Sequence, residues 1–253
     1  MGYGDSILDS GAVRIAQQTD PRKCKVILGR KRIWSEVWDN NPRIAKFEDE
    51  GDFNYIFGRH PDSNMRPYHK AKTDKRWIYN LDYRPTVGEI YFKPYEVNFG
   101  KIYFPEVIIE PNIKRKANPN KQYPWELWQQ FAYMATREGI KLSQLGPPGT
   151  RTLNGVPLIE TPSFRHACSV LSRAKAYVGH EGGMHHAAAA LNVKGVVIFG
   201  GFTPVELTGY EIHRNIGSSL DDACGMRVHC DHCAKAMSEI TPEQILKELK
   251  GVL

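Results

Sequence analysis

The sequence predicts an α/β fold in which helices cover both faces of a mainly parallel sheet. Two observations carry this prediction: short apolar runs alternate with helical patterns after about residue 105, and a proline or hydroxyl residue precedes several of the helical patterns. The chain of 253 residues is long enough for one large α/β domain or two small ones. Its 41% hydrophobic and 25% charged residues are ordinary globular values.

The expected elements follow from these patterns in chain order. Residues 2–18 form a loop that enters a helix, whose start Asp5 or Ser6 can cap. The further expected strands are 25–28, 107–109, 142–145, 176–178 and 196–199, and the further expected helices are 124–138, 163–174, 184–191 and 242–249. We place a domain boundary near residues 97–105, which gives an N-terminal domain of residues 1–100 and a C-terminal domain of residues 101–253. Ligands of such sheets bind beyond the carboxyl ends of the strands.

The stretch from Arg59 to Pro85 combines basic and aromatic side chains, and we expect loops there with one or two strands. The whole chain has a formal net charge of +6 and a pI of about 9.0. This excess of positive charge favours polyanionic partners, namely nucleotides, nucleic acid or anionic lipid, although many basic proteins bind no polymer. A solvated loop is the simpler interpretation of this stretch.

The segment from Tyr177 to Gly201 combines a strand, a glycine turn and an alanine-rich helix. Gly182 and Gly183 allow the backbone to approach a ligand, and the amides and dipole of the helix start favour a diphosphate. Glu181 can accept hydrogen bonds from sugar or ribose hydroxyls, and His185 or His186 can donate one to a phosphate oxygen. A plain strand–helix–strand crossover would have the same pattern.

This segment resembles the signature of family 9 glycosyltransferases, the heptosyltransferase-like group. In that signature Asp-Ser-Gly-x-x-His precedes a small-residue helix, and here Glu181 takes the place of the Asp and His186 that of the His. The following loop, which contains Gly201 and Thr203, resembles the family's Gly-Pro-Thr-x-Pro-x-x-Thr-Gly. Residues 121–128 resemble the family's Lys-x-Trp-Pro-x-x-x-Trp, whose Lys contacts the donor phosphate, so Lys121 is the candidate here.

Residues 2–8 resemble the Gly-Asp loop that opens the family's N-terminal domain, in which the Asp is the proposed general base. Asp5 takes that place, and an inverting transfer needs such a group to deprotonate the acceptor hydroxyl. Asp9, one turn later, could assist or be merely exposed. Residues 146–149 depart from the family, which often has an acidic residue there that holds the nucleotide ribose.

The resemblance implies two Rossmann-like domains that face each other across a cleft (GT-B-like), and a glycosyltransferase that uses a nucleotide-diphosphate sugar and no required cofactor or metal. The donor-binding candidates are Lys121, Glu181, Gly182, Gly183, His185, His186, Gly201 and Thr203. From the basic and aromatic stretch between Arg59 and Pro85 we expect the acceptor to be a hydroxymethylated base in DNA, as for certain phage enzymes, or a phosphorylated glycan or lipopolysaccharide core. The acceptor-binding candidates are Arg66, Lys70, Arg76, Trp77 and Tyr79.

Two other classes stay open. A non-catalytic nucleic-acid-binding protein on the same fold would show salt-dependent DNA affinity. A nicotinamide-dependent oxidoreductase is disfavoured, because no Gly-x-Gly-x-x-Gly follows a strand.

Three of the five cysteines form a cluster that suggests a zinc site: Cys224, Cys230 and Cys233, with His229 and His232 nearby. Only one Cys-x-x-Cys pair is present, so we expect no bound metal. The sequence shows no signal peptide and no apolar stretch of the roughly 18 residues that span a bilayer. We therefore expect a cytoplasmic protein without disulfides or a transmembrane segment.

Overall fold

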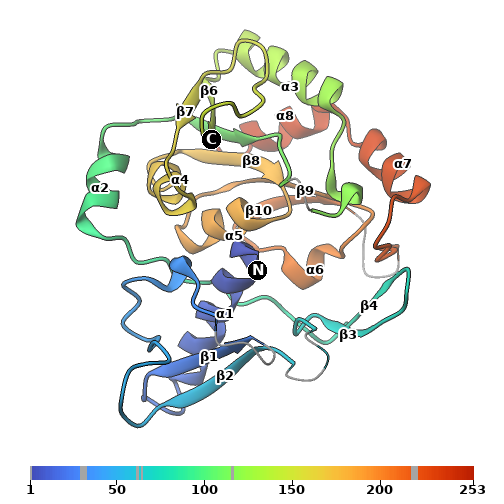
Figure 1. Cartoon of the computed structure of the whole chain (residues 1–253). Coiled ribbons are helices and arrows are strands. Elements are labelled where there is room, and N and C mark those ends of the chain that lie inside the picture. Colours follow the sequence, from blue (N-terminus) through green and yellow to red (C-terminus); the bar gives the residue numbers. More distant parts are fainter. Residues whose placement is uncertain (1, 29–32, 61–62, 64, 115–116, 218–221) are drawn as a thin grey trace.

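A computed structural model of the chain describes residues 2–28, 33–60, 63, 65–114, 117–217 and 222–253 (Figure 1). The described helices are α1 (Tyr3–Ala16), α2 (Pro94–Lys101), α3 (Trp125–Arg137), α4 (Phe164–Leu171), α5 (Gly183–Ala190), α6 (Val205–Thr208), α7 (Asp231–Glu239) and α8 (Pro242–Lys250), with 3-10 turns η1 (Glu36–Trp38) and η2 (Pro119–Lys121). The described strands are β1 (Cys24–Leu28), β2 (Asn54–Arg59), β3 (His69–Lys72), β4 (Trp77–Tyr79), β5 (Val107–Glu110), β6 (Leu142–Gly146), β7 (Leu158–Glu160), β8 (Ala176–His180), β9 (Gly195–Gly200) and β10 (His213–Gly217).

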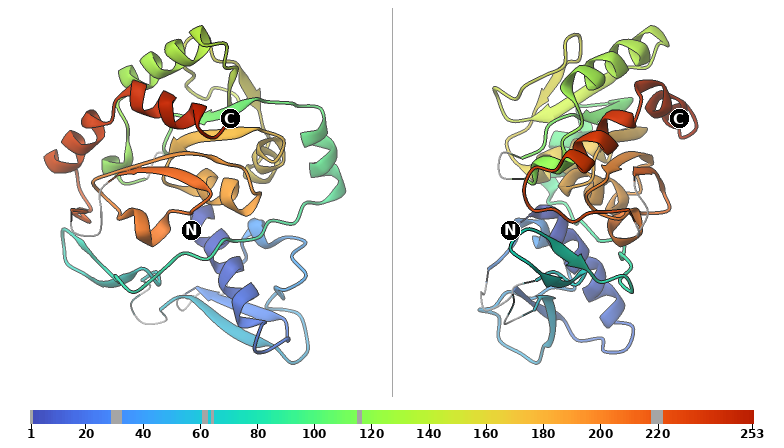
Figure 2. Two further views of the ribbon diagram at one scale, coloured as in Figure 1. Left: turned by 180° about the vertical axis from the view of Figure 1, so that it is seen from behind. Right: turned by 90° about the vertical axis from the view of Figure 1, so that its right-hand side faces the viewer.

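The second half of the chain forms a parallel sheet of six strands in the order β10-β9-β8-β5-β6-β7. Successive side chains of a strand point to opposite faces. Val107 and Ile109 therefore pack against α3 and α8 on one face, whereas Ile108 packs against α4 and α5 on the other. Figure 2 shows these helices on the two sides of the sheet. The predicted α/β fold class is confirmed.

The first half of the chain forms a smaller unit with one two-stranded parallel sheet, β1 and β2, beside α1. Its apolar side chains belong to the same core as α4 and α5, because Ile7 and Val13 of α1 join Val26 of β1 and Ala187 of α5 in one buried cluster. The two units are therefore packed together through α1 and α5.

The start of α1 differs from the expectation. The helix begins at Tyr3 with Gly2 as its N-cap residue, and neither Asp5 nor Ser6 caps it. Asp5 lies inside the first turn, where its carboxylate is free to point away from the helix backbone.

Residues 59–85 form the expected loops and two short strands, β3 and β4, which pair as an antiparallel hairpin. The hairpin lies against the chain segment before α7, far away in sequence (Figure 1). Trp77 N donates to Gly225 O over 2.9 Å, and Arg227 N donates to Lys75 O over 2.7 Å. The hairpin thus connects the first unit to the last quarter of the chain.

Helix α2 ends at the predicted domain boundary and is anchored on α4 by a buried ion pair. Arg165 Nε lies 2.6 Å from Glu96 Oε1, and the two side chains are 4% and 1% exposed. Gly100 allows this close approach, because a Cβ there would lie 2.6 Å from the backbone oxygen of Ser169.

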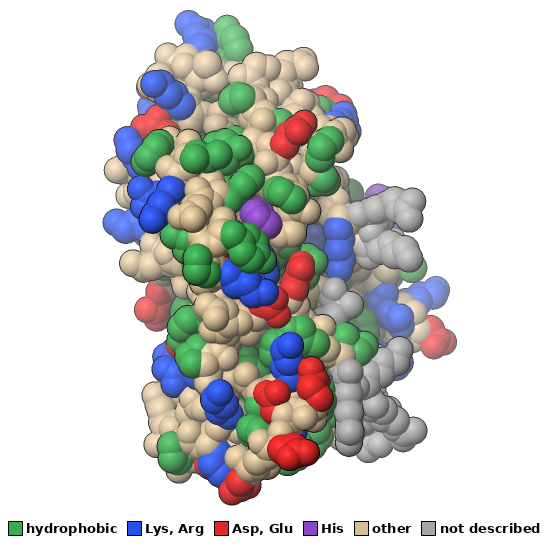
Figure 3. Space-filling view, turned by 60° about the vertical axis from the view of Figure 1, so that its left-hand side comes forward, with side chains coloured by type: hydrophobic (Ala, Val, Ile, Leu, Met, Phe, Trp, Pro, Cys, Tyr) green, Lys and Arg blue, Asp and Glu red, His purple; other side chains and the backbone are tan. Residues whose placement is uncertain are grey.

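The face in Figure 3 carries Lys and Arg side chains interspersed with Asp and Glu, so the positive surplus is not gathered into one patch on this side. None of the described helices has the length and apolar character that a membrane span requires.

Candidate functional site

A cavity of about 500 Å³ lies where the two units meet. Its floor is formed by residues at the carboxyl ends of β5 and β8, Glu110 and His180, which is where ligands bind in open parallel sheets. The first residues of α1 and of α5 form two further walls, and the hairpin and the loop after β9 contribute Trp77 and Phe202.

The N-termini of α1 and α5 meet at this cavity. A Cβ at Gly4 would lie 2.5 Å from Cδ2 of His186, so only glycine allows α1 to come this close to α5. The first amides of a helix have no partner within the helix, and the helix dipole makes this end positive. Two such ends facing one cavity favour an anionic ligand.

Asp5 is the carboxylate that α1 presents to the cavity. Arg66 Nε donates to its Oδ1 over 2.7 Å, Arg59 to its Oδ2 over 3.1 Å, and the Tyr68 hydroxyl to Oδ1 over 3.1 Å. Burial alone would raise the pKa of Asp5, but Arg66, Arg59 and Tyr68 outweigh burial and lower it. Asp5 is therefore ionised at neutral pH and held in a fixed orientation.

From the sequence we expected Asp9 either to assist Asp5 or to be exposed, and the structure shows a different environment. Its side chain is not exposed but buried, with Oδ2 lacking a hydrogen-bond partner, and it does not line the cavity. Burial and the nearby charge of Asp5 raise the pKa of Asp9 well above its ordinary value. The pKa values of the two carboxyls on α1 are thus shifted in opposite directions.

Lys121, Glu181 and His186 form a polar network in the wall of the cavity beside the start of α5. Lys121 Nζ contacts Glu181 Oε2, and His186 Nε2 lies 3.8 Å from Glu181 Oε1. His186 Nδ1 is 2.7 Å from the hydroxyl of Tyr210, which fixes the imidazole ring. Burial raises the pKa of Glu181, but Lys121 and His186 overcome this effect and hold it well below the ordinary range.

A second cavity of about 380 Å³ adjoins the first and shares Glu110, Asn112 and Phe164 with it. It lies at the carboxyl ends of β5, β6 and β7, and Ile109, Leu145 and Pro147 make part of its lining apolar. Glu110 stands at the junction of the two cavities, where the hydroxyl of Tyr177 donates to its Oε2 over 2.9 Å. Burial raises the pKa of Glu110 to about 7, against the opposing effect of this hydrogen bond.

The structure brings nine of the residues singled out from sequence to the larger cavity: Asp5, Arg66, Trp77, Lys121, Glu181, Gly182, Gly183, His186 and Thr203. Arg66 was expected to contact the acceptor, and its guanidinium pairs with Asp5. Trp77 stacks on His69, with ring centroids 4.3 Å apart.

Other singled-out residues lie outside the cavity lining. His185 is fully buried beside Phe199 and His213, where its Nδ1 accepts from Gly182 N over 3.4 Å. Gly201 faces the ring of His232, to which a Cβ would come within 2.7 Å. His185 thus supports the α5 turn from within, and Gly201 makes room for a side chain of α7.

Three of the expected acceptor residues also lie elsewhere. Lys70 and Arg76 are exposed on the hairpin, and neither lines the cavity. Tyr79 is buried, and its hydroxyl donates to Phe202 O over 2.5 Å, which makes it a structural link between hairpin and loop.

His229 is exposed and does not group with the three cysteines of the C-terminal cluster; His232 takes that place.

Sequence reasoning missed Glu110 as a lining residue, and it gave no role to Tyr68 or His180, although both lie in the segments that it singled out. Glu110 and His180 end strands that pair with each other in the sheet, so the rule that ligands bind at strand ends was the signal that could have found them. Tyr68 gave no such signal, because its position depends on the path of an irregular loop.

Comparison with known proteins identifies the fold. Searches of protein-family models and of curated proteins match nothing. Among solved structures, the chain is similar to a family 9 glycosyl transferase from Veillonella parvula, with a TM-score of 0.66, 15% identity, and coverage of 100% of this chain and 94% of that one. The chain is also similar to the E. coli heptosyltransferase WaaC, solved with ADP, with a TM-score of 0.61, 13% identity, and coverage of 100% of this chain and 98% of that one.

A third similar structure is the iron-containing dodecameric glycosyltransferase TibC from enterotoxigenic E. coli, with a TM-score of 0.66, 13% identity, and coverage of 100% of this chain and 73% of that one. The chain therefore has the fold of family 9 glycosyltransferases, which confirms the α/β fold that the resemblance implies, although the described part of the first unit has a parallel sheet of only two strands.

Proposed function

We propose that the protein is a glycosyltransferase that moves a sugar from a nucleoside-diphosphate sugar to an acceptor hydroxyl with inversion. The observation that carries this proposal is one cavity in which an ionised, oriented Asp5 faces the N-terminus of α5 and Lys121. A base and a site for a leaving diphosphate are the two parts that such a transfer requires. The likeness to family 9 structures supports the same reaction class.

The donor diphosphate would lie against the start of α5. Gly182 and Gly183 leave its backbone amides open to a ligand, and Lys121 supplies a positive charge from the facing loop. Thr203 adds a hydroxyl from the loop after β9. As the bond from the sugar to the diphosphate breaks, these groups stabilise the negative charge that develops on the leaving oxygen.

The nucleoside would occupy the adjoining cavity. Its apolar lining suits the faces of a base, and Glu110 at the junction suits the ribose hydroxyls, for which a carboxylate is an acceptor. Glu110 would then take the role of the acidic residue that is absent from residues 146–149. ADP is the first nucleotide to test, because the similar structure of WaaC was solved with it.

In the transfer step Asp5 accepts the proton of the acceptor hydroxyl while that oxygen bonds to the anomeric carbon and the diphosphate leaves from the opposite face. The low pKa of Asp5 keeps it unprotonated, and the hydroxyl becomes acidic enough to lose its proton as the new bond forms. Arg59 and Arg66 keep the carboxylate oriented during this step.

For the acceptor we propose a phosphate-bearing molecule, either DNA with a hydroxymethylated base or a phosphorylated glycan core. Arg66 and Trp77 of the expected acceptor residues line the cavity, and Lys70 and Arg76 lie exposed on the same hairpin. Lys and Arg near the mouth of a site attract phosphates in a salt-dependent way. We place the reaction in the reducing cytoplasm, where the five cysteines, all free in the structure, remain thiols.

The test of the proposed function is thermal unfolding with ADP, UDP, GDP, CDP, dTDP and NAD. A ligand at a hundred times its Kd stabilises the folded state by about 2.7 kcal/mol, which raises the midpoint by about 5–11 °C in a chain of this size. We expect one diphosphate to give this shift, and its sugar conjugate to be consumed when acceptor is added. No shift with any diphosphate, together with salt-dependent DNA binding, would favour the non-catalytic nucleic-acid-binding protein.

Glu110 gives a prediction for pH dependence. Because its pKa is about 7 in the folded chain and about 4.3 in an unfolded one, the folded state binds more protons between these values, and stability falls as pH rises through this window. We expect Glu110→Gln to remove this loss, so that the variant gains about 1–3 kcal/mol relative to wild type between pH 4.5 and 7.5 in urea unfolding.

A constant difference between the two proteins across this pH range would contradict the assignment of Glu110. The affinity for the nucleoside diphosphate tests the ribose contact separately. Wild type should bind the diphosphate more tightly as pH rises through 7, and this dependence should be absent in Glu110→Gln.

A further inference from the structure

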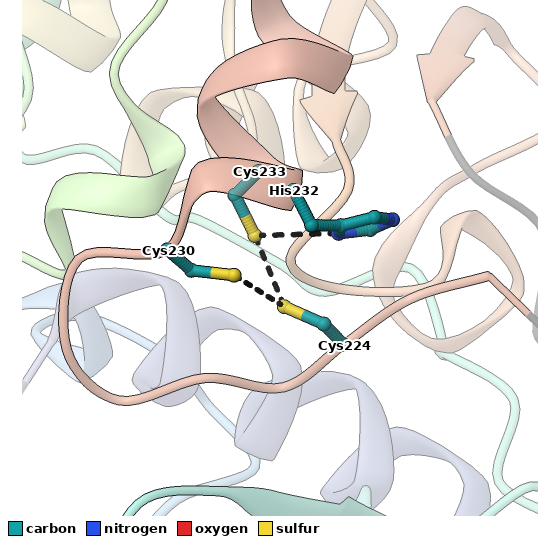
Figure 4. Close-up of side chains that lie close together, drawn as sticks. All are labelled: Cys224, Cys230, His232 and Cys233. Atoms are coloured by element: carbon teal, nitrogen blue, oxygen red, sulfur yellow. Dashed lines mark hydrogen bonds between the residues drawn. The ribbon is translucent and has the colours of Figure 1, made fainter.

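We propose that Cys224, Cys230, Cys233 and His232 bind one divalent transition metal, with Zn²⁺ as the best-suited ion. Figure 4 shows the three thiols and the imidazole directed toward one another, Cys224 from a loop and the others from the start of α7. One ligand atom of each residue lies within 4.8 Å of all the others. Three thiolates and one imidazole are a donor set of structural zinc sites.

The distances are close to those of a tetrahedral site. With Zn–S bonds of about 2.3 Å and a Zn–N bond of about 2.0 Å, ligand atoms lie about 3.6–3.8 Å apart. The Cys224 and Cys230 sulfurs are 3.9 Å apart, and the Cys233 sulfur is 4.0 Å from His232 Nδ1. The Cys224 and Cys233 sulfurs, at 3.0 Å, need to separate by less than 1 Å. Small side-chain rotations are therefore enough to form the site.

The surrounding chain supports this arrangement. Cys230 is the N-cap residue of α7 and Cys233 lies in its first turn, so the start of the helix holds these two ligands at a fixed spacing. Met226 N donates to the sulfur of Cys224 over 3.4 Å, and this hydrogen bond helps to orient the sulfur as a ligand. Gly201 provides the space for the ring of His232, because a Cβ would come within 2.7 Å of it.

The site would be structural, because it lies outside the lining of the larger cavity. The loop that carries Cys224 holds several parts of the cavity wall together. Gly225 accepts from Trp77 N and donates to Phe202 O, and Met226 O accepts from the amides of Asn118 and Asn120. A metal at the base of this loop would therefore fix the wall that Trp77 and Phe202 form.

A disulfide is the competing arrangement, and it has a different stoichiometry. Any one disulfide among the three cysteines uses two sulfurs and leaves the third as a free thiol, with no role for His232. A metal site engages all three sulfurs and the imidazole. Counting metal and free thiols in the same sample therefore distinguishes the two.

The experiment is elemental analysis of the full chain, purified under reducing conditions and reconstituted with Zn²⁺. We expect about one zinc per chain, loss of that zinc in Cys233→Ser, and a midpoint about 5–10 °C lower after chelation. Replacement of Zn²⁺ by Co²⁺ in the wild-type chain should give the visible absorption bands of a tetrahedral, thiolate-bound ion. This measurement does not depend on whether the variants fold. Iron at the same stoichiometry, lost in the same variant, would support the site and change its metal.

Two histidines give a matched control. His232→Ala should weaken Zn²⁺ affinity at least about tenfold, whereas His229→Ala, three residues earlier and exposed, should leave it unchanged. Cys24→Ser should retain the metal, because Cys24 lies in the first unit. Less than about 0.1 zinc per chain with all thiols reduced, or a disulfide found by mass spectrometry with no metal, would overturn the proposal. These readouts do not depend on transferase activity.

Discussion

Replacement of Asp5 by asparagine is expected to lower the rate of sugar transfer by about 10²–10⁴-fold while nucleotide binding is retained. Asparagine has nearly the same shape but cannot accept the proton of the acceptor hydroxyl. It also removes a negative charge from the cavity, so diphosphate affinity should stay the same or increase slightly. Initial rates of transfer and the thermal shift with the preferred diphosphate measure the two properties separately.

Asp9→Asn is the matched control for this variant. Asp9 lies one turn later on α1, and its raised pKa favours the neutral carboxyl, which an amide resembles in size and charge. We expect transfer within a few-fold of the wild-type rate. Wild-type transfer by Asp5→Asn would refute Asp5 as the base, and an equal loss in both variants would show that the effect comes from damage to α1.

Replacement of Arg165 by methionine is expected to cost about 3–5 kcal/mol of stability, because Glu96 would remain buried and unpaired. Arg165 makes two bonds to Glu96, of 2.6 and 2.7 Å, and donates to the backbone oxygens of Tyr91 and Glu36. It thus joins α4 to α2 and to the first unit. In a chain of this size the midpoint of thermal unfolding should fall by about 6–20 °C.

An exposed ion pair serves as the control for the buried pair of Arg165 and Glu96. Lys175, whose side chain is 68% exposed, pairs with Glu106, and Lys175→Met should cost less than about 1 kcal/mol. The double variant Arg165→Met with Glu96→Leu should recover part of the lost stability, because it leaves no unpaired carboxylate. Similar small losses in Arg165→Met and Lys175→Met would show that the buried pair contributes no more than a surface one.

The sequence predicts the centre of the second unit well because its strands are buried on both faces. β8 and β9 read as apolar runs, and each is followed by a glycine turn. The edge strands β7 and β10 were missed. β7 has only three residues and β10 contains polar residues, so neither forms an apolar run. Helix α2 was missed because its buried positions are Glu96 and Gly100, which give no apolar pattern.

The same reasoning explains which site residues could be predicted. Asp5, Lys121 and His186 each lie near the start of a helix within a recognisable motif. Adjacent helix positions are about 100° apart, so only one of His185 and His186 can face the cavity, and sequence alone does not give the helix orientation. Glu110 enters the site through the pairing of β5 with β8, whose strands are separated by more than sixty residues of chain.

The hairpin that forms one cavity wall has a consequence for how the protein folds. Trp77 and Gly225 are joined by a hydrogen bond across roughly 150 residues, but the hairpin is a separate two-stranded sheet, and three of the four residues of β3 are exposed. The free energy of local opening is smallest where few apolar contacts hold a segment and largest in core strands. The hairpin should therefore open, and its amide hydrogens exchange with solvent, long before the six-stranded sheet unfolds.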